Sequence, residues 1–187
     1  IIVAPGFGQR GLDGKILAVE YARVNKIPFL GICLGMQMAV IEYARNVKKI
    51  RYANSTEISE KCKDPVIDLM TSQKEIINKG GTMRLGAWDC EILKNTISNK
   101  IYSKKVVSER HRHRYEFNDE YSKKIFDENF IVAGKNPETN LVEIVENKDH
   151  PWFVGVQFHP EYKSSVYNPH PIFVNFVKAS LKNYLKK

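Results

Sequence analysis

A cysteine stands between two glycines in the segment Gly31-x-Cys33-x-Gly35, where an apolar run gives way to a helical pattern. Small neighbours permit the sharp, strained turn between a strand and a helix that exposes a nucleophile. The first turn of the following helix also favours a thiolate, because its free N–H groups carry partial positive charge. A lone cysteine more often serves as a small buried hydrophobe, so the nucleophile prediction needs a base.

A histidine and a glutamate near the other end of the chain can supply that base. His159 follows the apolar segment 152–158, and Glu161 comes two residues later. In an extended segment these two side chains share a face and reach each other. Taken singly, they are more often a structural histidine and a surface carboxylate. Together with Cys33 they predict a triad in which the imidazole takes the thiol proton and the carboxylate fixes the imidazole tautomer.

The elements that must position these residues alternate between strands and helices. The apolar patterns predict strands at 1–4, 28–33, 141–146 and 152–158, and helices at 13–24, at 37–44 and from residue 171 onward. The last helix carries one apolar stripe: Phe173, Phe176, Val177, Leu181 and Tyr184. We expect only short strands and loops from 54 to 130. This order predicts an α/β fold with a mostly parallel central sheet, helices on both faces, and ligands at the carboxyl ends of the strands.

Composition and charge limit the classes of function. The 187 residues carry a formal net charge of +8, but the lysines are scattered along the chain, which is typical of a solvated surface. We therefore expect no nucleic-acid partner. The sequence contains neither an apolar run of membrane-spanning length nor a secretory signal, so we expect no membrane partner. Three widely spaced cysteines suit neither a disulfide framework nor a zinc site, which favours a reducing, cytoplasmic location and no metal.

Longer segments resemble a known family. The segments 31–37 and 157–161 resemble the signature pair of class I glutamine amidotransferases, and the segments 53–57, 81–86, 109–116 and 150–153 resemble the glutaminase part of CTP synthases. The resemblance is weakest at 59–79 and 94–105. It implies that residues 1–187 are one flavodoxin-like glutamine amidotransferase domain that hydrolyses L-glutamine to glutamate and ammonia. Because the first strand leads directly into a candidate loop, we expect the domain to lack its N-terminal elements.

The same resemblance implies partners and cofactors. Ammonia would pass to an amidoligase domain of the same polypeptide, which would convert UTP to CTP with ATP and Mg. These residues contain no Gly-x-x-x-x-Gly-Lys phosphate loop, so that domain is expected outside them. The glutaminase part itself would need no cofactor, and the full-length enzyme would be a homo-oligomer.

The resemblance also assigns roles at the site. Cys33 would attack the side-chain amide of glutamine to form a glutamyl thioester, while His159 would protonate the departing ammonia and Glu161 would orient His159. The backbone N–H groups of Gly6 and Leu34 would hold the oxyanion. The implied substrate-binding positions are Gly6, Leu34, Gly35, Met36, Gln37, Glu57 and Arg114.

Two charges suit the two ends of an amino acid. Glu57 would bind the ammonium group, and Arg114 can hold the carboxylate with two parallel hydrogen bonds. Arg114 ends a compact basic run, Arg110-His-Arg-His-Arg114, which on charge alone could bind a phosphate or nucleic acid. The run lacks the interleaved aromatic residues of a nucleic-acid surface, so we favour glutamine recognition, with the remaining basic residues facing the missing domain.

One residue departs from the CTP synthase pattern. Pro5 replaces the first glycine of a Pro-Gly-Gly-Phe-Gly loop. Proline has a fixed backbone angle and no N–H, so we expect Pro5 to restrict the loop that carries Gly6. Two other functions remain open: a hydrolase that releases its product to water, as peptidases and gamma-glutamyl hydrolases do, and a catalytically silent module kept for contact or regulation.

Overall fold

The computed structural model describes residues 1–8, 11–69 and 83–186. Within these residues the main sheet has the strand order β1-β2-β10-β9-β8-β5-β6. Its strands are β1 Ile2–Val3, β2 Phe29–Ile32, β5 Arg84–Ile92, β6 Val106–His113, β8 Phe130–Lys135, β9 Val142–Asn147 and β10 Phe153–Val156. A second sheet has the order β3-β4-β7, with strands β3 Ala53–Ser55, β4 Asp64–Leu69 and β7 Tyr115–Phe117.

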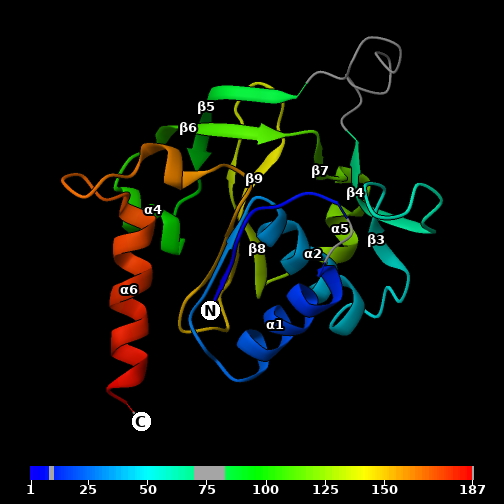
Figure 1. Cartoon of the computed structure of the whole chain (residues 1–187), viewed down its shortest axis with the longest axis horizontal. Helices are drawn as coiled ribbons and strands as arrows, with labels where there is room; N and C mark the ends of the chain where they lie inside the picture. The colour runs from blue at the N-terminus through cyan, green and yellow to red at the C-terminus, as the bar shows by residue number, and fades with distance from the viewer. Residues whose placement is uncertain (9–10, 70–82, 187) are drawn as a thin grey trace.

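The helices and 3-10 turns lie around these sheets (Figure 1). The helices are α1 Leu12–Val24, α2 Leu34–Asn46, α4 Ile97–Tyr102, α5 Ser122–Ile125 and α6 Pro171–Tyr184, and the 3-10 turns are η1 Asp119–Tyr121 and η2 Pro160–Lys163. The predicted α/β fold is therefore confirmed.

The main sheet is mixed, so the prediction of a mostly parallel sheet is wrong. Strand β2 runs parallel to β1 and β10, but β10, β9, β8, β5 and β6 pair antiparallel in that order. Connection length explains the difference. A short loop at 148–152 can join β9 to β10 only as a hairpin, whereas the crossover from β1 to β2 contains α1. The expected pairing of the two strands around 141–158 is confirmed.

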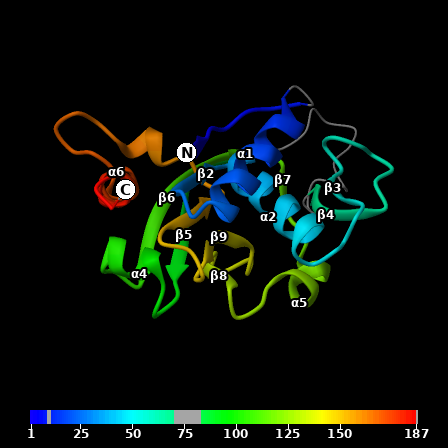
Figure 2. The ribbon, with the colours of Figure 1, turned by 90° about the horizontal axis from the view of Figure 1, so that it is seen from below.

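Helices cover both faces of the main sheet, as predicted. Figure 2 shows α4 and α6 on one side of the strands and α1 and α2 on the other. Phe29 and Phe153 pack with α1 and α2, and their rings stack with centroids 4.3 Å apart. The next residues along the same strands, Leu30 and Val154, pack toward α6. Successive side chains of a strand point to opposite faces, and here both faces are apolar.

Helix α1 buries the predicted residues Ile16, Val19 and Ala22. Helix α2 is buried on all sides from Leu34 to Ala44, although it contains the charged residue Glu42. Arg23 of α1 donates two hydrogen bonds to the Glu42 carboxylate, at 2.8 and 2.6 Å. A paired, doubly hydrogen-bonded charge is tolerated in a core, so this contact fixes α1 on α2.

Helix α6 follows its predicted stripe only in its first turns. Of the predicted stripe, Phe176 is buried and Phe173 is partly buried, but Val177, Leu181 and Tyr184 are 61%, 57% and 75% exposed. Ile172, which was not predicted, is fully buried. Figure 1 shows the reason, because the C-terminal turns of α6 extend away from α4 and the sheet. The apolar stripe of α6 is therefore longer than the part of the helix that packs on the rest of the protein.

The middle of the chain contains longer strands than the sequence predicted. Strands β5 and β6 pair antiparallel along almost their whole lengths. In β6, Arg110 and Arg112 are exposed while His111 and His113 are buried, so the predicted basic cluster is divided between two faces of a strand. The first two residues of the segment 81–86 lie outside the described residues.

Two glycines allow α2 to lie directly on the parallel strands. A Cβ atom on Gly31 of β2 would come within 2.7 Å of the backbone of Gly35, and a Cβ atom on Gly35 would overlap the carbonyl oxygen of Val3 in β1. Contacts this short cannot be relieved by rotating a side chain. The start of α2 is therefore fixed against β1 and β2.

We predict that Gly35→Ala destabilises the protein, because the added methyl group forces α2 away from β1. Overpacking of this kind typically costs about 1–3 kcal/mol of unfolding free energy. The matched control is Gly14→Ala, on the exposed face of α1, where an added Cβ meets no atom within 4 Å. In the control the free energy of unfolding should be unchanged or higher. Both variants are measured by urea denaturation, with tryptophan fluorescence as the signal. Equal stability of the two variants would contradict the proposed close contact.

Candidate active site

Cys33 occupies a strained turn between β2 and α2. Its backbone angles are φ 51° and ψ −105°, a left-handed conformation that residues with side chains rarely adopt. The Cys33 N–H donates to Val156 at 2.7 Å, and the Cys33 carbonyl accepts from the N–H groups of Met36 and Gln37 at 3.0 and 3.2 Å. The strained turn predicted from the two flanking glycines is therefore present.

Burial controls the protonation of the Cys33 thiol. The residue is 4% exposed, and its burial raises the pKa of the thiol to about 12. A hydrogen bond from the Leu34 backbone opposes this rise, the Glu57 and Glu161 carboxylates add to it, and the Gln157 side-chain amide opposes it. We expected the helix start to favour the thiolate, but in this structure the cost of burying a charge is larger. A base must therefore remove the proton.

His159 and Glu161 form the predicted pair. The His159 Nδ1 and Glu161 Oε1 atoms are 2.6 Å apart, and the His159 ring stacks on Tyr162 with centroids 4.9 Å apart. The prediction that the pair lies in an extended segment is wrong, since Pro160 begins the 3-10 turn η2, which contains Glu161. The buried Nε2 atom of His159 has no hydrogen-bond partner among the described residues. With Nδ1 held by a carboxylate, Nε2 is the atom that can accept a proton.

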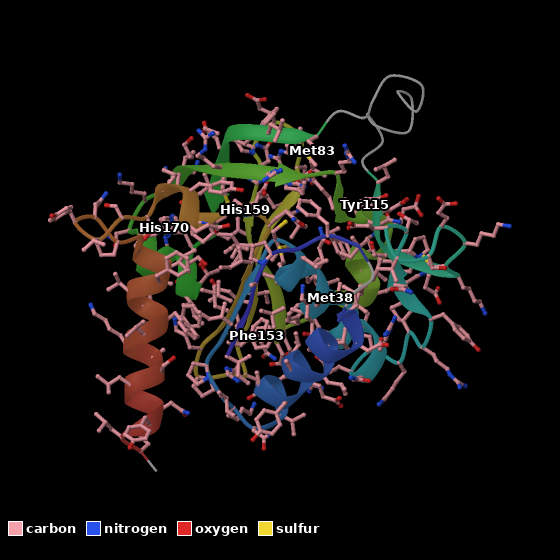
Figure 3. The ribbon with its side chains drawn as sticks, in the orientation of Figure 1. Met38, Met83, Tyr115, Phe153, His159 and His170 are labelled. Atoms are coloured by element: carbon pink, nitrogen blue, oxygen red, sulfur yellow. The ribbon has the colours of Figure 1, made fainter. Side chains whose placement is uncertain are left out.

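The parallel pairing of β2 and β10 brings these residues to one edge of the sheet. Ile32 is opposite Val156, so Cys33 and His159 both follow the carboxyl ends of neighbouring strands. In Figure 3, His159 lies at the same end of the molecule as Met83 and Tyr115, while Phe153, at the start of β10, lies at the other end of its strand.

A small hollow opens beside Cys33. It is lined by Gly6, Phe7, Cys33, Leu34, Gln37, Glu57, Met83, His113, Arg114 and Tyr115. Six of the predicted site residues thus meet at one place. The other four predicted residues are not among its lining residues: Gly35 packs on β1, the Met36 side chain lies close to Gly155, and the pair His159 and Glu161 lies outside the lining.

The second sheet positions the two predicted substrate-binding charges. Glu57 follows β3, and one of its carboxylate oxygens accepts a hydrogen bond from the Gly8 N–H at 3.2 Å. Arg114 is the single residue between β6 and β7, where the chain passes from the main sheet to the second sheet. Both charges therefore depend on how the two sheets meet.

Gln37 lies in the wall of the hollow as the helical spacing from Cys33 predicts. Its Nε2 donates to the Tyr115 carbonyl at 2.9 Å and to Gln157 Oε1 at 3.2 Å. Both amide hydrogens of Gln37 are thus used within the protein. Its Oε1 is the acceptor that remains for a ligand.

The sequence did not predict four of the lining residues. Three of them are Phe7, His113 and Tyr115. Each is adjacent in the sequence to a predicted site residue, Gly6 or Arg114, so the sequence could have indicated them by proximity. The Arg112 guanidinium lies 5.9 Å from the centroid of the Phe7 ring, a contact between distant segments. Met83 lies in the segment 81–86, which resembles CTP synthases, but the sequence assigned it no role at the site.

A cluster of buried ionisable residues lies beneath the junction of the two sheets. Arg84 contacts Glu143 at 2.7 Å and Glu116 at 3.4 Å. The rings of His111 and His113 share a hydrogen bond of 2.9 Å between Nδ1 and Nε2. Burial lowers the pKa of His111 to about 2 and that of His113 to about 3, so both rings are neutral. Burial also raises the pKa of Glu116 to about 8 and that of Glu143 to about 7, against the opposing effect of Arg84.

The ranges 1–8, 11–69 and 83–186 contain neither a metal cluster nor a membrane span. No group of three or more histidine, cysteine, aspartate or glutamate residues in these ranges could hold a metal ion. No helix in them is long and apolar enough to cross a membrane. The three cysteines, Cys33, Cys62 and Cys90, are free thiols.

Comparisons with known proteins agree with this geometry. The family described as glutamine amidotransferase class-I matches residues 1–179. A CTP synthase of Christiangramia forsetii is 60% identical over 187 residues, which are 100% of this chain and 34% of that protein. A CTP synthase of Cytophaga hutchinsonii is 62% identical over 180 residues, covering 96% of this chain and 33% of that protein. The chain thus spans about a third of the length of these curated relatives.

Solved structures give the same result. The glutaminase domain of a Trypanosoma brucei CTPS with bound acivicin superimposes with a TM-score of 0.91 at 42% identity, covering 97% of this chain and 70% of that one. A glutamine amidotransferase of Thermotoga maritima superimposes with a TM-score of 0.55 at 17% identity, covering 86% of this chain and 55% of that one. The second likeness concerns the fold alone.

We predict that the buried cluster makes stability depend on pH. The folded protein holds protons on Glu116 and Glu143 that the unfolded chain loses near pH 4.5, so their contribution to stability falls as pH rises toward 8. The two histidines act oppositely, but only below their ordinary pKa of 6.5. Unfolding free energy should therefore fall by about 1 kcal/mol or more between pH 6.5 and 8.5.

The test is urea denaturation at both pH values for the natural protein and for Glu116→Gln. The variant cannot lose a proton at this position, so its stability should change less over the same range. Identical pH dependence of the two proteins would show that Glu116 does not titrate as the cluster requires.

Proposed function

This chain belongs to the class I glutamine amidotransferase family, and we propose that it hydrolyses L-glutamine to glutamate and ammonia as the glutaminase part of a CTP synthase. One observation carries the proposal: a single hollow contains the Cys33 nucleophile, the Gln37 amide and the charges of Glu57 and Arg114. A thiol beside an anion and a cation fits an amino acid whose side chain carries the reacting group.

Binding uses the charges at the two ends of the substrate. The Glu57 carboxylate pairs with the ammonium group of glutamine, and the Arg114 guanidinium holds its carboxylate. Gln37 offers its Oε1 as a further acceptor. With its α-carbon groups fixed in this way, the glutamine side chain extends toward Cys33, and orienting a reactant in this manner lowers the barrier to attack.

The chemistry follows from the arrangement of the triad. His159 accepts the thiol proton on Nε2, and the Cys33 sulfur attacks the amide carbonyl. His159 then gives the proton to the leaving ammonia, which leaves a glutamyl thioester, and a water molecule activated by His159 hydrolyses it. Glu161 holds Nδ1 and stabilises the imidazolium ion.

Backbone donors stabilise the negatively charged intermediate. The N–H groups of Leu34 and Gly6 are the proposed oxyanion donors, and loss of one such donor typically costs about 3–4 kcal/mol. Gly6 keeps its N–H although Pro5 precedes it. Pro5 narrows the conformations of this loop, which limits how far the Gly6 peptide can reorient.

The ammonia is proposed to be used elsewhere in the same polypeptide. The CTP synthase relatives are about three times as long as this chain, and this supports a separate amidoligase domain that binds ATP, UTP and Mg. On this proposal residues 1–187 are a glutaminase domain without cofactor or metal, and the full-length enzyme is a cytoplasmic homo-oligomer with no nucleic-acid or membrane partner. The three free thiols support a reducing compartment.

Cys33→Ala should abolish CTP formation from glutamine in the full-length protein, because no thiol remains to attack the amide. CTP formation from added ammonium should continue, since the amidoligase step needs only ammonia. The two activities are measured by following CTP at saturating UTP and ATP, with either glutamine or an ammonium salt. Equal loss of both would contradict the proposed division between domains, and unchanged glutamine-dependent activity would exclude Cys33 as the nucleophile.

Arg114→Ala should raise the KM for glutamine by at least about tenfold, because the substrate carboxylate loses a charge-assisted pair. Arg110→Ala is the matched control: Arg110 is an exposed arginine of the same basic run, but it does not line the hollow. Its KM should stay close to that of the natural protein. A larger increase in KM for Arg110→Ala than for Arg114→Ala would show that Arg114 does not bind the carboxylate of glutamine.

A further inference from the structure

Gln157 contacts the nucleophile although it belongs to neither the triad nor the predicted substrate-binding set. It follows β10 directly, is fully buried, and donates its backbone N–H to the Glu143 carbonyl at 2.8 Å. Its side-chain Nε2 lies 3.6 Å from Cys33 Sγ, within hydrogen-bond distance for sulfur. The hydrogen of this amide therefore points at the reacting atom.

The orientation of the Gln157 amide is fixed by a second glutamine. Gln37 Nε2 donates to Gln157 Oε1 at 3.2 Å, and the same Nε2 is held by the Tyr115 carbonyl at 2.9 Å. Because the oxygen of Gln157 already faces a donor, its nitrogen is the end that faces the sulfur. Reversing the amide would place nitrogen against nitrogen and lose the hydrogen bond from Gln37, and it would leave a thiolate facing an oxygen.

The Cys33 sulfur needs such a donor. Burial and the carboxylates of Glu57 and Glu161 all disfavour a negative charge there, and two hydrogen bonds, from Leu34 and Gln157, act the other way. The Leu34 N–H is also a proposed oxyanion donor, so it serves the substrate oxygen once attack begins. The Gln157 amide can therefore donate to the sulfur both before and during the attack on the substrate.

We propose that Gln157 stabilises the Cys33 thiolate through its side-chain N–H and that Gln37 orients it for this purpose. In this step the S–H bond breaks, its proton moves to His159 Nε2, and the negative charge left on sulfur receives a charge-assisted hydrogen bond. The role of this thiolate in glutamine hydrolysis rests on the function proposed above, but the contact with sulfur does not.

The test measures the rate at which iodoacetamide alkylates Cys33 as a function of pH, by mass spectrometry of the Cys33 peptide in the full-length protein. Gln157→Met keeps a side chain of similar length but has no donor. It should raise the apparent pKa of Cys33 by about one unit or more, which lowers the alkylation rate at a fixed lower pH about tenfold. An apparent pKa equal to that of the natural protein would overturn the proposal.

A second variant and a control separate this role from a general packing effect. Gln157→Asn keeps an amide but is one methylene shorter, so its N–H falls short of the sulfur and the same upward shift is expected even if Gln157→Met does not fold. Ser98→Ala removes a fully buried hydroxyl in helix α4, beside the Glu146 carboxylate, and should leave the apparent pKa of Cys33 unchanged. An equal shift in Ser98→Ala would assign the effect to packing and reject the role of Gln157.

Glutamine kinetics on the same variants distinguish the two proposals. If the natural protein hydrolyses glutamine, Gln157→Met should lower kcat with little change in KM, because Gln157 contacts the sulfur and does not line the hollow. A raised KM with an unchanged kcat would contradict a role in thiolate formation. If the natural protein releases no glutamate but the pKa shift is observed, the proposed function fails while the assignment of Gln157 stands.

Discussion

The close contact between the start of α2 and the two parallel strands β1 and β2 is the constraint on which the rest of the site depends. Gly31 and Gly35 permit a backbone separation that any side chain would prevent. The chain can therefore turn sharply at Cys33, which takes a strained conformation and is nearly enclosed. The same enclosure raises the pKa of the thiol. The strained backbone of Cys33, the burial of its thiol and the need for a base to remove the thiol proton thus have one structural origin.

One hydrogen-bond donor to the buried sulfur and the proposed base both follow the same neighbouring strand. Strand β10 lies parallel to β2, and the residues that follow it supply Gln157 beside the sulfur and His159 at the same edge. The turn η2 then brings Glu161 back to His159. A protonated thiol at rest and a poised imidazole are compatible, since catalytic hydrogen bonds are often loose until substrate binds.

A buried group of ionisable residues joins the strands that lie beside the proposed substrate-binding residue Arg114. Arg84 of β5 contacts both Glu143 of β9 and Glu116 of β7 at the point where the main sheet meets the second sheet. The Arg84 guanidinium is a buried charge, which is costly without partners, so a junction that moved Glu116 or Glu143 away would leave Arg84 uncompensated. This requirement fixes the position of β7 on the main sheet. Arg114, directly before β7, is placed by the same contacts.

The sequence by itself determined the local chemistry: the turn at Cys33, the pairing of His159 with Glu161, and the helices and strands nearest to them. Short-range patterns suffice there because each feature depends on a few adjacent residues. Only the tertiary structure decided that the sheet is mixed, that the basic run is a strand with its histidines inside, and that Gln157 contacts the sulfur. Those features depend on which distant segments pair and on which face of a strand is buried, and local residue patterns do not encode that choice.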